Sequence, residues 1–155
     1  MFKRSLGIAL AFCCMQLSAA ELAEEKSYGD WQYRCGEESC ALSQIVRNVA
    51  QAPVMQISLF KDAEQRTLVR LALPLNVNLR RGAVITQGDL QQPIDYLYCT
   101  DGSCFAGGVL PEPMVAAFRA GDEGGVNFIS MKAGPLRAGF SLKGFTAGHR
   151  QLLKQ

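Results

Sequence analysis

Trp31-Gln32-Tyr33-Arg34-Cys35 alternates apolar with polar residues and decides the fold class of this chain. Successive side chains of an extended strand point to opposite faces, so a period of two predicts a strand with one buried face. The same pattern returns, strictly or loosely, along much of the sequence. Together with residues 31–35, the segments 40–46, 55–59, 69–73, 94–98, 126–131 and 136–142 make about seven predicted strands.

Turn-forming residues separate these strands. Residues 48–53, 61–65 and 121–125 are rich in glycine, proline or polar side chains, and Arg81-Gly82 is a shorter turn signal. Short strands with turns at this spacing favour an antiparallel sandwich or barrel. We therefore predict an all-β domain.

Two segments break the period of two. Residues 113–120 begin with a proline and stop before Gly121, which predicts a short helix. From residue 144 onward, apolar side chains recur at helical spacing and predict a second amphipathic helix, which would close one end of the sandwich.

The first 20 residues have the composition of a cleavable signal peptide. Lys3 and Arg4 precede an apolar run over residues 6–17, and Ser18-Ala19-Ala20 offers small side chains at a cleavage site. The apolar run is too short to span a membrane, which takes about 20 residues. We expect cleavage after Ala20.

Removal of residues 1–20 sets the expected domain organisation and location. A polar lead over residues 21–27 would precede one β-sandwich domain over residues 28–155. A domain of this size buries a hydrophobic core without further cross-links. We expect a periplasmic or secreted protein with no stable membrane span after cleavage.

The net charge of +2 comes from 16 basic and 14 acidic residues, and two of the basic residues leave with the signal peptide. The mature chain is then neutral, which gives no general electrostatic attraction to nucleic acid. The charge is uneven, because residues 82–125 hold one cation, Arg119, among several acids, and residues 126–155 hold basic side chains and no acid. These stretches pair in the fold, form an ordinary solvated surface, or supply a basic patch for anionic envelope lipid or polysaccharide.

The expected compartment determines the oxidation state in which we expect the cysteines. Two of the six fall in the signal peptide, and the others form two pairs with one spacing, Cys35-x4-Cys40 and Cys99-x4-Cys104. An even number of cysteines in an oxidising compartment predicts disulfides, although counting alone leaves three connectivities open. We favour the two local pairs because each brackets turn-forming residues between predicted strands. Four thiolates around a structural zinc ion remain the alternative.

Catalytic chemistry has little support in this chain. Its one histidine, His149, excludes multi-histidine zinc sites and leaves a packing or surface role as the simplest interpretation. A nucleophilic pair of Cys104 and His149 would need an unpaired Cys104. Nucleotide-binding and nucleophile-elbow motifs are absent from the sequence. We expect no catalytic residue, no cofactor and no metal, so the protein is predicted not to be an enzyme.

Aromatic residues cluster on two of the predicted strands. Trp31 and Tyr33 share one face of their strand, where we expect them in the core rather than on a binding surface. We expect the same of Tyr28, Tyr96 and Tyr98.

Several longer landmarks occur in order along the chain. They are Tyr28-Gly29-Asp30-Trp31-Gln32-Tyr33-Arg34-Cys35, Cys40-Ala41-Leu42-Ser43-Gln44, Leu73-Pro74-Leu75, Arg81-Gly82, Tyr98-Cys99 with Cys104-Phe105-Ala106, and Ser141-Leu142-Lys143-Gly144-Phe145-Thr146-Ala147. Together, over residues 28–150, they resemble the invasion-associated locus B family of exported bacterial proteins. The resemblance implies a small immunoglobulin-like β-sandwich in the periplasm, at the cell envelope or in the medium, without catalytic residues. Some pathogenic members of that family are linked to entry into host cells.

The leading functional prediction is a non-enzymatic binding protein of the envelope or the medium. Its partner would be an unknown protein or an envelope or host-surface ligand. A disulfide-bearing structural or stress-related periplasmic protein is the alternative. A hydrolytic enzyme and a zinc-binding protein are weaker alternatives.

Overall fold

The computed structural model describes residues 24–154, so the expected signal peptide, residues 1–20, lies outside the described residues. In chain order the elements are β1 (Glu24–Tyr28), β2 (Trp31–Cys35), β3 (Cys40–Arg47), β4 (Pro53–Lys61), β5 (Thr67–Leu73), the 3-10 helix η1 (Leu79–Arg81), β6 (Ala83–Gln87), β7 (Leu90–Ile94), β8 (Tyr96–Cys99), β9 (Cys104–Val109), α1 (Glu112–Ala120), β10 (Glu123–Ser130), β11 (Gly134–Ser141) and α2 (Phe145–Leu152).

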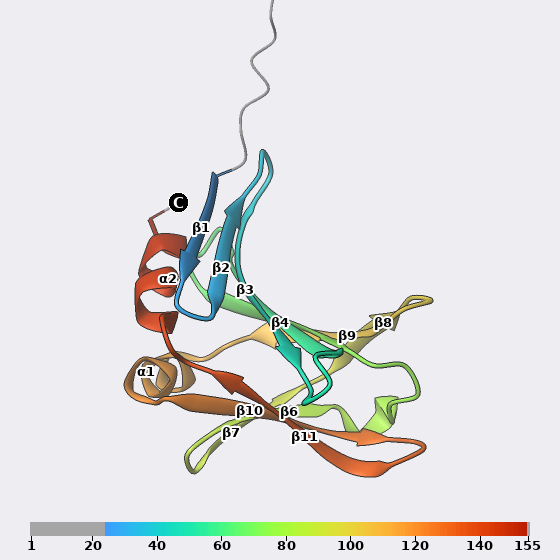
Figure 1. The fold of residues 1–155 in the computed structure, drawn as a ribbon. Helices are drawn as coiled ribbons and strands as arrows, with labels where there is room; N and C mark the ends of the chain where they lie inside the picture. Colours follow the sequence, from blue (N-terminus) through green and yellow to red (C-terminus); the bar gives the residue numbers. More distant parts are fainter. Residues whose placement is uncertain (1–23, 155) are drawn as a thin grey trace, which may run out of the picture.

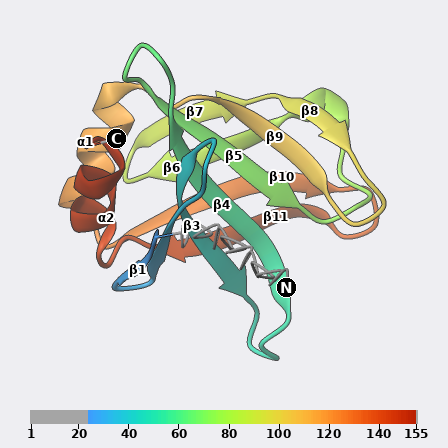
Figure 2. The same ribbon diagram turned by 90° about the horizontal axis from the view of Figure 1, so that it is seen from above.

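The strands form two antiparallel sheets (Figure 1). One sheet has seven strands in the order β1-β2-β3-β4-β5-β9-β8, and the other has four in the order β11-β10-β6-β7. Seen from above, β10 and β11 lie behind the seven-stranded sheet (Figure 2). The predicted immunoglobulin-like antiparallel β-sandwich with short helices is confirmed, and α1 and α2 lie where the sequence places helices.

Some strands do not show the alternation of apolar and polar residues. Strand β1 lies in the segment expected to be a polar lead, and its side chains are largely exposed, so only its backbone pairing with β2 makes it a strand. Strands β6, β7 and β9 were not predicted either. Strand β7 contains two glutamines and a proline, which an edge strand tolerates. Strand β9 is interrupted by two glycines.

The predicted single strand over residues 94–98 is wrong. Ile94 ends β7 in the four-stranded sheet, whereas Tyr96 begins β8 in the seven-stranded sheet. The chain crosses from one sheet to the other at Asp95. Because Ile94 is buried and Tyr96 partly buried on either side of the crossing, the alternation in the sequence continues through it and hides the break.

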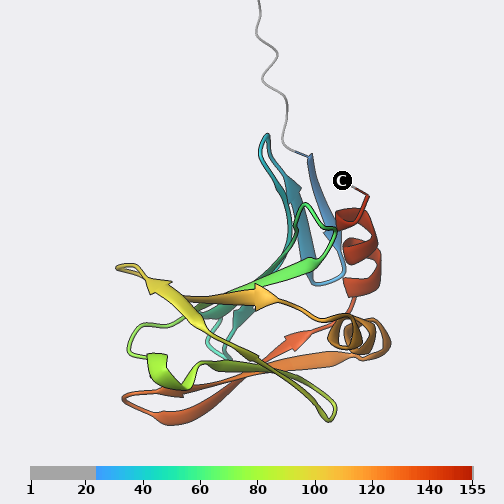
Figure 3. The ribbon, with the colours of Figure 1, turned by 180° about the vertical axis from the view of Figure 1, so that it is seen from behind.

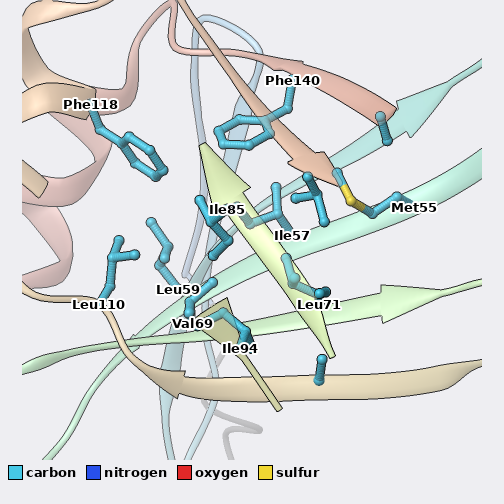
Figure 4. Packing of buried hydrophobic residues seen from close by; sticks show 14 of the residues in the cluster. Met55, Ile57, Leu59, Val69, Leu71, Ile85, Ile94, Leu110, Phe118 and Phe140 are labelled. Carbon is cyan, nitrogen blue, oxygen red and sulfur yellow. The ribbon is translucent and has the colours of Figure 1, made fainter. Parts of the chain in front are cut away.

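The core fills the space between the sheets, and Figure 4 shows side chains from both sheets pointing into it. Its labelled strand residues are Met55, Ile57, Leu59, Val69 and Leu71 from the larger sheet and Ile85, Ile94 and Phe140 from the smaller one. Close packing of this kind stabilises a domain through the apolar area that it removes from water.

An aromatic cluster joins the helices to the core. Trp31 is fully buried, as expected, and its ring centroid lies 5.5 Å from that of Phe145 on α2. Phe118 on α1 contacts Phe145 and Phe140 at 5.4 Å each, edge to face. The two helices therefore close one end of the sandwich.

The opposite end consists of irregular segments and turns. Figures 1 and 3 show α1 and α2 at one end, and η1 with the β10–β11 turn at the other. Val77 forms an isolated bridge with Ser130, which holds the segment before η1 against the end of β10.

Candidate functional site

His149 lies in a chain of hydrogen-bonded polar side chains. Its Nε2 is 2.8 Å from Thr67 Oγ1, and its Nδ1 is 3.3 Å from a guanidinium nitrogen of Arg119. Arg119 also donates to Glu112 at 2.9 Å. A guanidinium only donates hydrogen bonds, so Nδ1 must accept, and Nε2 carries the proton that it donates to Thr67.

The surroundings of His149 oppose its protonation. Burial lowers the pKa of its imidazole, the positive charge of Arg119 lowers it further, and the pKa falls to about 4. Its side chain is 1 % exposed. An imidazole that stays neutral and has both nitrogens occupied is a structural group, which agrees with the packing role expected from the sequence.

The four cysteines of residues 24–154 form two disulfides, Cys35–Cys40 and Cys99–Cys104. Each joins residues that face one another across neighbouring strands, β2 with β3 and β8 with β9. Of the connectivities left open above, the local pairs are the ones present. Because every one of these sulfurs is in a disulfide, neither a four-thiolate zinc site nor a Cys104–His149 nucleophile can form in this oxidised protein.

Loss of either disulfide is expected to be tolerated. Closing a six-residue loop contributes about 2 kcal/mol in the chain-entropy model, and the paired strands already hold each loop closed. We predict that Cys35→Ser with Cys40→Ser lowers the free energy of unfolding by about 2 kcal/mol or less. Denaturant titration of the double variant and the oxidised parent tests this, and a failure to fold would contradict it.

Apolar side chains cover much of the outer surface of the seven-stranded sheet. Three rows of side chains face away from the core between β4 and β8, and we call them the outer face. They are Phe60, Leu68 and Val109 in the first row, Ser58, Arg70 and Leu97 in the second, and Gln56, Ala72, Phe105 and Tyr98 in the third. The two polar side chains of β4 bond to one another, because the amide of Gln56 donates to Ser58 Oγ at 3.1 Å. Neither helix of residues 24–154 packs extensively against β4, β5, β8 or β9.

Rings and one cation organise the outer face. The guanidinium of Arg70 lies 5.0 Å from the ring centre of Phe60, and Tyr98 stacks on Phe105 at 4.9 Å. Leu97 is 59 % exposed and Tyr98 51 % exposed. The expectation that Tyr98 lies in the core is therefore wrong, because the irregular pairing of β8 with β9 turns its ring outward.

The composition of β5 indicates the outer face, although the alternating pattern does not. Strand β5 reads Thr-Leu-Val-Arg-Leu-Ala-Leu, so both of its faces are apolar apart from Thr67 and Arg70. Strands that bury one face normally carry polar residues on the other. Apolar residues on both faces of an uncovered strand therefore indicate a contact surface.

A second feature lies on the four-stranded sheet beside η1. A hollow of about 480 Å³ is lined there by Arg81, Val84, Ile129, Pro135, Arg137 and other residues. Arg137 pairs with Glu123 at 3.0 Å. The hollow therefore combines apolar walls with guanidinium groups.

The basic C-terminal residues do not form one patch. Lys132 lies in the β10–β11 turn, Arg137 lies on β11, and Lys143, Arg150 and Lys154 lie near α2 at the other end. Within the described chain, Arg137 with Glu123 is the one ion pair that joins the basic stretch to the acidic stretch. Neither the single basic patch nor general pairing of the two stretches describes the structure.

The chain has no match among curated proteins, and it does match solved structures. The crystal structure of invasion-associated protein B from Bartonella henselae aligns with a TM-score of 0.78 over 84 % of this chain and 96 % of that chain. The two sequences are 20 % identical, so the likeness extends to the fold. No helix among the described residues is long and apolar enough to cross a membrane. The family model for invasion-associated locus B (IalB) protein matches residues 31–153, and the chain belongs to this family.

Proposed function

We propose that this protein is an exported, non-enzymatic binding protein of the cell envelope or its surroundings, and that it holds a protein partner against the outer face. The observation that carries the proposal is the uncovered apolar surface formed by β4, β5, β9 and β8. Large exposed apolar surfaces on soluble domains mark sites of interaction. Two disulfides and membership of a family of exported proteins support the location.

The single cation of the outer face restricts the partner. Arg70 stacks on Phe60 and has no ion pair with any described residue. A second copy packed face to face and centred on Arg70 would place two guanidinium groups together in an apolar contact, which is costly. A partner with apolar side chains around one carboxylate would pair with Arg70 instead.

The test compares capture by matched variants of the exported protein. Immobilised parent protein, Leu97→Asp with Tyr98→Ser, and Leu90→Asp are incubated with native envelope extract and with host-cell surface extract. Leu90 is 41 % exposed and lies on β7, in the other sheet, so it controls for an added surface charge. We predict that the outer-face variant recovers a specific protein at least about tenfold less well than the parent, because burying one leucine contributes about 1.5–3 kcal/mol.

The outcome separates the candidate functions. A protein recovered by the parent and by Leu90→Asp, but lost with the outer-face variant, supports the proposal, and its source identifies an envelope or a host partner. Equal recovery by all three proteins contradicts the proposal. If nothing is recovered while loss of the gene weakens the envelope, the structural or stress-related role is favoured.

A further inference from the structure

We propose that the end of the sandwich opposite the helices binds the surface of an anionic lipid bilayer. This end combines η1 with the β10–β11 turn, and we call it the cationic tip. Its residues are Leu79, Arg80, Arg81, Met131, Lys132 and Leu136. The tip is separate from the outer face, so this proposal stands independently of the proposed protein partner.

Backbone contacts hold the two parts of the tip together. Asn78 N donates to Ile129 O at 2.8 Å, and Met131 N donates to Asn76 O at 2.7 Å. Asn78 also caps η1, because its side chain accepts from Arg80 N at 3.2 Å. Residues far apart in the sequence are therefore fixed side by side, so the cations of η1 and of the β10–β11 turn lie on neighbouring segments.

The charge of the tip is not neutralised. Arg80, Arg81 and Lys132 are exposed, and none forms an ion pair within the part of the chain that the structure describes. Asp95 lies close to Gly82, yet it too forms no ion pair among the described residues. Three free cations on adjacent segments attract an anionic surface at about 1 kcal/mol each.

Apolar side chains project from the same segments. Leu79 is 53 % exposed, Met131 is 67 % exposed and Leu136 is 41 % exposed. Apolar side chains flanked by Lys and Arg suit the boundary of a bilayer, where acyl chains lie directly beneath the phosphates. A nucleic acid offers phosphates but no apolar phase for these side chains. This combination selects the lipid surface among anionic partners.

Co-sedimentation with vesicles tests the proposal. The full exported protein is mixed with vesicles of phosphatidylcholine alone, or with added phosphatidylglycerol, at low and at high salt. We expect binding only to the anionic vesicles, with a loss at high salt. Arg80→Gln with Arg81→Gln and Lys132→Gln should require roughly 100-fold more lipid for half binding, at about fivefold per charge.

A second triple variant controls for net charge. Lys143→Gln with Arg150→Gln and Lys154→Gln removes the same charge near α2, at the far end of the molecule. This control should bind within about threefold of the parent, because salt screens distant charges. Equal loss in both triple variants, or no binding by the parent at low salt, would overturn the proposal.

Insertion of the apolar residues has its own measurement. In a Leu79→Trp variant, the added fluorescence should shift to the blue and be quenched by lipids brominated on the acyl chains. Trp31 is fully buried and serves as the internal reference. Binding without quenching of the added tryptophan would mean attraction to the headgroups alone and would overturn the bilayer assignment. Circular dichroism confirms that each variant is folded.

Discussion

Gly144→Ala is expected to lower the free energy of unfolding by more than about 3 kcal/mol. Gly144 has φ +87°, a left-handed conformation that strains residues with a Cβ atom. It also lies directly against the turn between β1 and β2. An added Cβ would overlap the carbonyl group of Tyr28 and lie 2.7 Å from the backbone nitrogen of Gly29. Backbone atoms on both sides cannot move aside cheaply, because Asp30 N also donates to Lys143 O at 3.1 Å.

Gly134→Ala is the matched control for this prediction. Gly134 has a similar φ of +76°, but no heavy atom lies within 4 Å of its added Cβ position. Its substitution should therefore cost only the backbone strain, about 1 kcal/mol. Urea titration followed by the fluorescence of the buried Trp31 measures both variants. Equal destabilisation by the two would contradict the role assigned to the contact between Gly144 and the β1–β2 turn.

Hydrogen bonds also join the N-terminal strands β2 and β3 to the end of β11. Trp31 Nε1 donates to Ser141 O at 3.0 Å, and the amide of Gln44 donates to Ser141 O at 3.0 Å and accepts from Ser141 N at 2.9 Å. Alternation predicted the strands that carry these residues. It could not predict that β3 and β11 meet, because a period of two encodes which face is buried and not which strand lies opposite.

The proposed binding surfaces also depend on which segments the fold brings together. The cationic tip depends on a bridge between Val77 and Ser130, which holds the segment before η1 beside the β10–β11 turn. In the sequence, Lys132 belongs to a basic stretch whose other members the fold places elsewhere. The disulfides, by contrast, depend on short loops, so local turn chemistry was sufficient to favour them.

His149 is expected to make the protein markedly less stable in mild acid. Its pKa is about 4 in the folded protein, against 6.5 ordinarily, so between these values the unfolded chain binds a proton that the folded protein excludes. The free energy of unfolding therefore falls as the pH drops from about 6.5 to about 4. At 1.36 kcal/mol per pKa unit, the loss is about 3 kcal/mol. Above pH 7 the imidazole is neutral in both states, and its contribution does not change with pH.

The variant His149→Gln isolates this effect, because an amide does not titrate. At pH 7.5 it should be less stable than the parent, because its contacts with Thr67 and Arg119 are altered. Between pH 7.5 and pH 4 the parent should lose about 3 kcal/mol more free energy of unfolding than the variant does. Burial tends to raise the pKa of Asp62, but its hydrogen bonds and charge interaction with Arg66 hold that pKa below 3.8. The stability that Asp62 contributes is therefore lost mainly below pH 4, outside the range in which His149 acts. Arg119→Gln supplies the complementary test: removal of the neighbouring positive charge lets the pKa of His149 rise, which narrows the pH window and should reduce the total loss of stability. Parallel pH curves for the parent and His149→Gln would show that carboxylates, and not the buried imidazole, set the acid sensitivity.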